Sequence, residues 1–225
     1  MTQIVSDPRA APDSAIRWPE VVAGVALNLI PIAGVLFWHW SPFALIFLYW
    51  LENVVIGART LASIFVSGFG RGPVSGAGSA ALGAFFTVHY GMFCFVHGMF
   101  VMLLFGNAPG ATTWGGPFDL AGAAGRLFAT QSNLAVGFAS IVLWQVVVFV
   151  LFVMRGEATR MTPSQIMSAP YGRIIILHVT VLFGGFVLMS LGWPIIGVVL
   201  LAAFKTLADV APALGLRGPA KKAAT

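Results

Sequence analysis

The sequence predicts an all-α fold: a polytopic membrane bundle of six transmembrane helices with both termini in the cytoplasm. Of 225 residues, 59% are hydrophobic and 8% are charged, and the mean hydropathy is +0.93. These values lie far from the composition of a soluble domain. Apolar runs long enough to cross a hydrocarbon core of about 30 Å recur along most of the chain. The basic residues also fall almost entirely on one side of these runs.

Six apolar stretches define the expected helices. Ser41 and Pro42 open the second, as a cap followed by proline at the first helical position. Pro31 lies within the first and is expected to kink it. The fifth ends at Gly192, almost without a loop before the sixth. The stretches are residues 19–37, 42–66, 81–105, 134–154, 173–191 and 194–211.

This pattern divides the chain into three parts. Residues 1–18 form a polar N-terminal tail, 19–211 the transmembrane domain and 212–225 a basic C-terminal tail. The first part has no short apolar core followed by a small-residue cleavage site, so we do not expect a signal peptide. The single cysteine, Cys94, lies within an apolar run and excludes an intrachain disulfide.

The basic residues predict the orientation. Ten lie on the side of the termini, against Arg126 alone on the other, and Lys205 lies inside the sixth span. Because cytoplasmic loops are enriched in lysine and arginine, both termini should be cytoplasmic, in a cell membrane such as the bacterial inner membrane. The ten are Arg9, Arg17, Arg59, Arg71, Arg155, Arg160, Arg173, Arg217, Lys221 and Lys222.

The distribution of basic residues also indicates which binding partners to expect. The sequence pI of about 10.0 is explained by cytoplasmic loops, so we expect the lipid bilayer as partner and no nucleic acid. The sequence leaves self-association into a homo-oligomer open.

Two connections carry helical patterns of their own. Thr162, Pro163 and Gln165 form a capping box that opens a short helix ending before Pro170. Residues 119–130 place Leu120, Ala124, Leu127 and Phe128 on one helical face. Each segment either lies in the membrane interface or is pressed against the bundle.

Seven ionisable side chains lie inside the apolar stretches. A charge near the bilayer centre is costly and is usually found facing protein or water, with a partner. These positions are therefore candidates for a functional site. They are Glu52, Arg59, His89, His97, His178, Lys205 and Asp209.

The third span has two distinct faces. Thr87, Gly91, Cys94 and Gly98 form a small-residue stripe suited to close helix packing. His89 and His97 lie on another face, about 12 Å apart along the axis, too far for an ordinary i, i+4 metal pair. The stripe is expected to pack against another helix of the chain.

Depth in the bilayer groups some of the polar residues. At 1.5 Å per residue, Glu52 lies near the midplane, with His89, His178 and Lys205 on its cytoplasmic side. We therefore expect Glu52, His89 and His178 to share one polar pocket, with Lys205 at its cytoplasmic side. His97 falls in the outer half of the membrane. Other polar residues expected near the site are Asn53, Tyr90, His97, Arg173 and Lys205.

Four motifs resemble an uncharacterised family of prokaryotic multi-pass membrane proteins, over most of the chain. The resemblance implies a shared fold and shared polar intramembrane residues, with no established activity. A histidine often found in the fourth span of that pattern is absent here, where Gln145 follows Leu143 and Trp144. The motifs are Tyr49-Trp50-Leu51-Glu52-Asn53, His89-Tyr90-Gly91 with His97-Gly98, Pro170-Tyr171-Gly172-Arg173 through His178, and Lys205-Thr206 with Asp209.

Three functions stay open. The first is an intramembrane site for zinc, iron or manganese, with Glu52, His89, His178 and Asp209 as ligands. An open position with bound water would permit hydrolysis, with Glu52 as the candidate catalytic group, so the sequence leaves open whether the protein is an enzyme. The others are a proton, ion or small-solute pathway, and a scaffold whose polar residues lock helices together. Haem is disfavoured, because the spacing of His89 and His97 does not suit one haem face.

Overall fold

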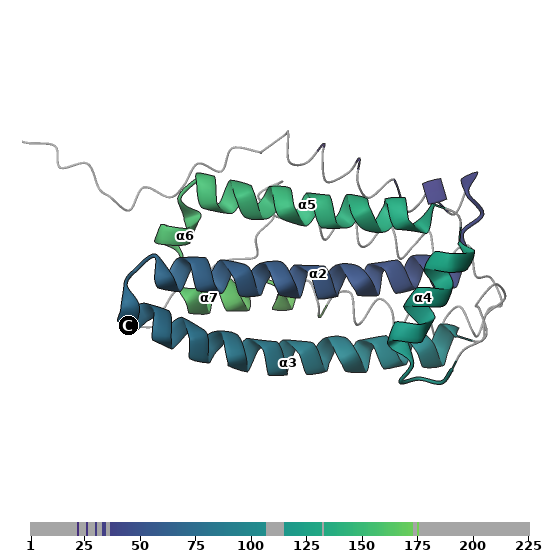
Figure 1. Cartoon of the computed structure of the whole chain (residues 1–225), viewed down its shortest axis with the longest axis horizontal. Helices are drawn as coiled ribbons and strands as arrows, with labels where there is room; N and C mark the ends of the chain where they lie inside the picture. The colour runs from purple at the N-terminus through teal and green to yellow at the C-terminus, as the bar shows by residue number, and fades with distance from the viewer. Residues whose placement is uncertain are drawn as a thin grey trace, which may run out of the picture.

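In the computed structural model, helices are the only regular secondary structure of the described residues (Figure 1). It describes residues 37–106, 115–131 and 133–172, with isolated positions at 22, 26, 30, 33, 34 and 175. Most of the predicted span 19–37, and all or nearly all of the spans 173–191 and 194–211, lie outside these residues. The helices are α2 (Pro42–Phe69), α3 (Pro73–Phe105), α4 (Leu120–Thr130), α5 (Leu134–Met154), α6 (Glu157–Arg160) and α7 (Pro163–Ser168).

Three of these helices are long and apolar enough to cross a membrane. They are Phe43–Phe69, Pro73–Phe105 and Leu134–Met154. They coincide with the second, third and fourth predicted spans, and α5 has the predicted bounds. In Figure 1, α2 lies between α5 and α3, with which it makes its main helix contacts. This part of the chain is therefore an all-α bundle of the kind found in membrane proteins.

The α2 helix begins where the sequence predicts. The Ser41 hydroxyl accepts a hydrogen bond from the backbone N–H of Ala44 at 3.1 Å, and Pro42 occupies the first helical position. The backbone N–H of Ser41 donates to Gln131 Oε1 at 3.1 Å, which ties this end of α2 to the end of α4. Trp40 and Phe47 are buried in the apolar cluster at this end.

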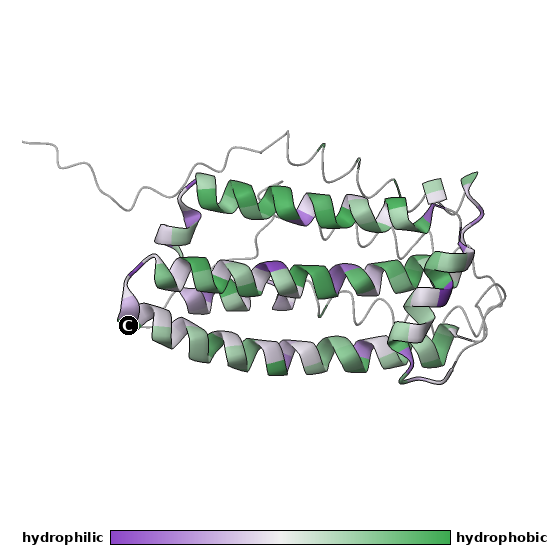
Figure 2. Ribbon diagram, in the orientation of Figure 1, coloured by the Kyte–Doolittle hydropathy of each residue, from purple (hydrophilic) through white to green (hydrophobic). Residues whose placement is uncertain are grey.

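The α3 helix begins at Pro73 rather than near residue 81. Residues 73–80 lack large side chains, and Figure 2 shows the first turns of α3 as pale beside the green of α5. A Cβ on Gly76 would lie 2.5 Å from the Phe69 ring, and one on Gly68 would collide with Ser79. The small residues thus let α2 and α3 approach closely beside their tight turn, which hydropathy alone does not reveal.

The α4 helix crosses the bundle at one end, which we call the α4 end (Figure 1). Asp119 caps it by accepting from the Gly122 N–H at 3.0 Å. Leu120, Ala123 and Leu127 are its buried residues, and Ala124 and Phe128 pack partly against the same cluster. The segment is pressed against the bundle, and its buried face is centred on Ala123 rather than Ala124.

The opposite end, which we call the α7 end, holds the α2–α3 turn, α6 and α7 (Figure 1). The capping box predicted at Thr162 and Gln165 is present. From the turn, Arg71 donates to the carbonyl oxygens of Thr159 (2.8 Å) and Met161 (2.7 Å) and to the Ser67 hydroxyl. One guanidinium therefore joins the α2–α3 turn to the α6–α7 segment.

Candidate functional site

The polar residues of α2 lie along one side of the helix. At 100° per residue, Glu52, Arg59 and Ser63 fall within a narrow arc, with Asn53 and Thr60 between this arc and α3. The side chains of Glu52 and Asn53 are almost fully buried, with exposed fractions of 6% and 7%. The middle of α2 thus carries a buried carboxyl and a buried amide within a membrane-crossing segment.

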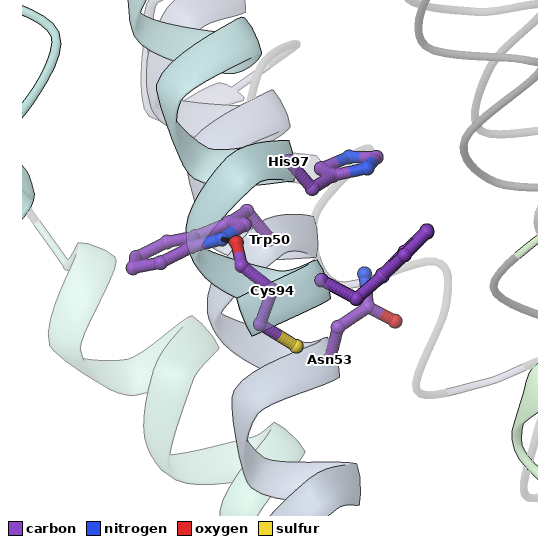
Figure 3. Close-up of a pocket in the computed structure, with 5 residues that line it drawn as sticks. Trp50, Asn53, Cys94 and His97 are labelled. Atoms are coloured by element: carbon purple, nitrogen blue, oxygen red, sulfur yellow. Dashed lines mark hydrogen bonds between the residues drawn. The ribbon is translucent and has the colours of Figure 1, made fainter. Parts of the chain in front are cut away.

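Asn53 lies in a small hollow between α2 and α3. Figure 3 shows Asn53 and His97 projecting to the same side of this helix pair, while the Trp50 ring projects to the other. The residues that line the hollow pack too closely to admit a water molecule. They are Trp50, Asn53, Phe93, Cys94 and His97.

Two hydrogen bonds between the helices fix the walls of this hollow. The Tyr90 hydroxyl donates to the backbone carbonyl of Asn53 at 3.0 Å, and the Trp50 indole N–H donates to the Cys94 carbonyl at 2.8 Å. Gly98 makes room for the indole, because a Cβ there would lie 2.8 Å from Trp50. Two of the four motifs of the resemblance, residues 49–53 and 89–98, therefore meet at one place.

The amide of Asn53 is only half satisfied. Its Nδ2 donates to the Tyr49 carbonyl at 3.2 Å, but its Oδ1 is buried without a hydrogen-bond partner in the part of the chain that the structure describes. A buried acceptor without a donor costs about 1–3 kcal/mol, and more where no water is available, as in a bilayer. This oxygen is therefore suited to a donor or a cation.

Helix geometry explains why His97 lies beside Asn53. Side chains lean toward the N-terminus of their own helix. Because α2 and α3 are antiparallel, Asn53 leans toward the α4 end and His97 leans toward the α7 end, so the two approach one another. His97 is buried, with 5% of its surface exposed. The bilayer depths estimated from the sequence count residues along straight helices and do not include this inclination of the side chains.

His89 lies elsewhere on α3. It is exposed, its ring stacks on Phe85 with centroids 5.4 Å apart, and it faces Tyr171 at 5.8 Å. The expected pocket of Glu52, His89 and His178 stays a prediction, since His178 lies outside the described residues, as do Arg173, Lys205 and Asp209. Within the described ranges, no group of three histidine, cysteine or acidic side chains is placed to hold a metal ion.

The small-residue stripe is divided between two environments. Cys94 and Gly98 face the hollow and the Trp50 ring. A Cβ on Gly91, in contrast, meets no atom of the described chain within 4 Å, and Thr87 is exposed. For Thr87 and Gly91 the expected packing against another helix stays a prediction, because the described residues leave both uncovered. The α2 residues that line the same space include Gly57 and Ala58, whose side chains are short. A groove therefore remains between α2 and α3 at this level.

Cys94 and Gln145 are named in the sequence analysis but are not included among its candidate site residues. Cys94 lines the hollow three residues before His97, and that spacing on one helical face could have indicated it. Gln145 is buried in α5, and an amide within an apolar run is a signal of the same kind as Asn53. Near the α7 end, burial raises the pKa of the Tyr171 phenol.

Comparison with known proteins gives a match to a family and none to an individual protein. A protein-family model described as a family of unknown function (DUF6498) matches residues 10–225. The searches of curated proteins and of solved structures found no match.

Proposed function

The chain belongs to DUF6498, a family of unknown function, and from that premise we propose a six-helix membrane protein that binds a divalent transition-metal ion inside the bilayer. In this proposal both termini are cytoplasmic and the membrane is the bacterial inner membrane. The placement of basic residues supports the orientation. Arg71, Arg155 and Arg160 lie at the α7 end, and Arg126 lies on α4 at the other end.

One observation supports the metal proposal: the Oδ1 of Asn53 has no hydrogen-bond partner among the described residues, and Asn53 lines a hollow that His97 also lines. A dehydrated metal ion needs less room than water, because side-chain oxygen and nitrogen atoms coordinate it directly at about 2.0–2.2 Å. A hollow too narrow for water can therefore still hold such an ion. Asn53 Oδ1 would contribute an oxygen and His97 a nitrogen, in a place where an isolated polar group is costly.

Further ligands would come from the neighbouring arc of α2 and from other spans. Glu52, buried one residue before Asn53, offers a carboxylate, and His178 and Asp209 are the predicted ligands from the fifth and sixth spans. Imidazole and carboxylate together suit zinc, iron or manganese. A hydrolytic reaction would require an additional bound water, for which Glu52 is the candidate base.

Metal analysis of the full-length chain tests this proposal. Protein purified in detergent, with its affinity tag removed and no chelator present, should retain zinc, iron or manganese near one ion per chain. His97→Gln should lose most of it. His39→Gln is the matched control, because His39 is exposed and lies outside the hollow. His89→Gln then decides whether the exposed histidine also contributes. A wild-type chain that takes up none of the three metals would overturn the proposal.

A scaffold is the second candidate, and the hydrogen bonds of Tyr90 and Trp50 between α2 and α3 favour it. In a scaffold these residues serve only to hold the helices together. Asn53→Leu separates the two functions. If Asn53 binds a metal, this variant should have a lower metal affinity than the wild type. If the protein is a scaffold, the variant should have an unchanged or raised thermal stability, because an unsatisfied buried oxygen is removed.

A further inference from the structure

The hollow that Asn53 and His97 line also contains a thiol. Cys94 lines it from the same helix as His97, three residues earlier, and is buried, with 7% of its surface exposed. Residues three positions apart on a helix are neighbours, with Cβ atoms about 5–6 Å apart. Figure 3 shows the Cys94 sulfur turned to the side of the helix pair on which Asn53 and His97 project. A thiol and an imidazole of α3 therefore line one hollow with an amide of α2.

The amide of Asn53 indicates that this group of side chains lacks a ligand. Its buried Oδ1 accepts no hydrogen bond from the described residues. The amide cannot simply be reversed, because its Nδ2 donates to the Tyr49 carbonyl at 3.2 Å. The Cys94 thiol does not satisfy the oxygen either, since its hydrogen bond is with the Tyr90 side chain. The hollow therefore holds an acceptor oxygen that a cation would satisfy.

A cation inside a bilayer needs ligands that neutralise its charge. Imidazole and amide ligands are neutral. Among the described residues that line the hollow, only Cys94 can supply a negative charge, because a cysteine binds metals as the thiolate and releases its proton on binding. Together with a carboxylate from the neighbouring arc of α2, one thiolate would neutralise a divalent ion.

The same ligands discriminate between the three metals considered above. Thiolate is a soft ligand that favours zinc, whereas manganese prefers carboxylate, carbonyl and water. The hollow is too narrow for water, so the ion must be held by protein atoms alone. Closed four-coordinate sites of this kind are typical of zinc, with sulfur at about 2.3 Å and nitrogen at about 2.0–2.1 Å.

From these observations we propose that Cys94 is a metal ligand in the hollow, together with His97 and Asn53, and that the site prefers zinc to iron and manganese. This inference deepens the proposed function and rests on metal binding at that site. It assigns a third ligand that the hydropathy and depth of the sequence do not indicate.

Cobalt(II) is the probe that tests this inference. A thiolate bound to cobalt gives an intense charge-transfer absorption in the near ultraviolet, which nitrogen and oxygen ligands do not give. Cys94 is the single cysteine of the chain, so this band in the full-length, tag-free protein can come from Cys94 alone. The wild type should show the band at about one cobalt per chain, and zinc should abolish it by displacing the cobalt.

Cys94→Ser should bind cobalt without the band, and its ratio of zinc affinity to manganese affinity should fall at least tenfold. Val101→Ala is the matched control, because Val101 is buried on the same helix but does not line the hollow. It should keep both the band and the ratio. If Cys94→Ser does not fold, the spectrum of the wild type decides alone.

The outcomes separate this inference from the proposed function. Cobalt bound to the wild type without the band, or an unchanged affinity ratio in Cys94→Ser, would overturn the assignment of Cys94 and leave the metal site itself standing. A wild type that binds neither cobalt nor zinc would overturn both.

Discussion

The Tyr90 hydroxyl donates a hydrogen bond to the backbone carbonyl of Asn53 across 3.0 Å. In an α-helix the carbonyl of Asn53 already accepts from the backbone N–H four residues later, that of Gly57, so the oxygen accepts a second bond from the neighbouring helix. The contact fixes α2 and α3 in register at the level of the candidate site. The position of the buried Asn53 amide relative to His97 depends on that register.

Tyr90→Phe should therefore lower the thermal stability of the protein in detergent. The expected loss is about 0.5–1.5 kcal/mol, the usual net value of one hydrogen bond. Tyr171→Phe is the matched control, because the Tyr171 hydroxyl has no hydrogen-bond partner in the described part of the chain. Equal thermal midpoints for both variants would show that the Tyr90 bond contributes nothing to stability.

Gly98→Ala should destabilise the protein more than Gly91→Ala. A methyl group on Gly98 lies 2.8 Å from the Trp50 ring, which must move, whereas one on Gly91 enters the groove. Overpacking of this kind typically costs about 1–3 kcal/mol. Thermal unfolding of the two variants in the same detergent measures the difference. A larger effect at Gly91 would mean that the groove is filled in the folded protein.

The α4 cap should make stability depend on pH in the acidic range. Donation from Arg126 at 2.7 Å, and next from the Gly122 N–H, holds the pKa of Asp119 below its usual value. Because the folded-state pKa is lowered, the ionised carboxylate stabilises the fold above the usual aspartate pKa of about 3.9. That stabilisation is lost as the pH falls through the lowered value.

Asp119→Asn should accordingly be less stable than wild type at neutral pH, and the two should converge as the pH falls below about 3.9. Thermal unfolding between neutral and acidic pH, with both proteins in the same detergent, measures the difference. A difference that stays constant down to acidic pH would assign the effect to the changed cap rather than to its charge.

Arg71→Ala should loosen the α6–α7 segment. The variant loses the bonds to the Thr159 and Met161 carbonyls and leaves the buried Ser67 with one partner fewer. Trypsin should then cleave after Arg155 or Arg160 faster than in wild type, because local opening exposes the backbone. Lys222→Ala, in the predicted C-terminal tail, is a control for removal of a positive charge. Unchanged cleavage would show that the segment is held by packing alone, through Ile166.

The proposed orientation predicts which end of the bundle is accessible from outside the cell. In a Cys94→Ala background, a cysteine at exposed Ala121 of α4 should react with a membrane-impermeant maleimide in intact cells. A cysteine at exposed Ser164 of α7 should react only after the cells are broken. The opposite pattern would reverse the topology.

Local chemistry was the part of the fold that the sequence could predict. The Ser41 cap, the Thr162 capping box and the bounds of α5 each depend on a few adjacent residues. The start of α3 was wrong because residues 73–80 contribute through close packing with α2, and a hydropathy pattern responds only to apolar side chains. Six membrane spans remain a prediction, as three of them fall outside the described residues.

The candidate site was less predictable, because it depends on the register of two antiparallel helices. Depth counted along each helix grouped Glu52 with His89 and placed His97 apart. The tilt of side chains toward each N-terminus, together with the Tyr90 and Trp50 hydrogen bonds, instead places His97 beside Asn53. Likewise, the small-residue pattern did not reveal that the described residues leave Gly91 uncovered, while Gly98 makes room for the Trp50 indole.

The Arg71 contact has a consequence for how sequences of this family can diverge. The guanidinium is held by the carbonyl oxygens of Thr159 and Met161, and every amino acid supplies a carbonyl. Substitutions at positions 159 and 161 can therefore accumulate without a compensating change at position 71. In an alignment of the family, we therefore expect an invariant arginine at position 71 and variable residues at positions 159 and 161. Analysis of co-variation between alignment columns would not detect this contact.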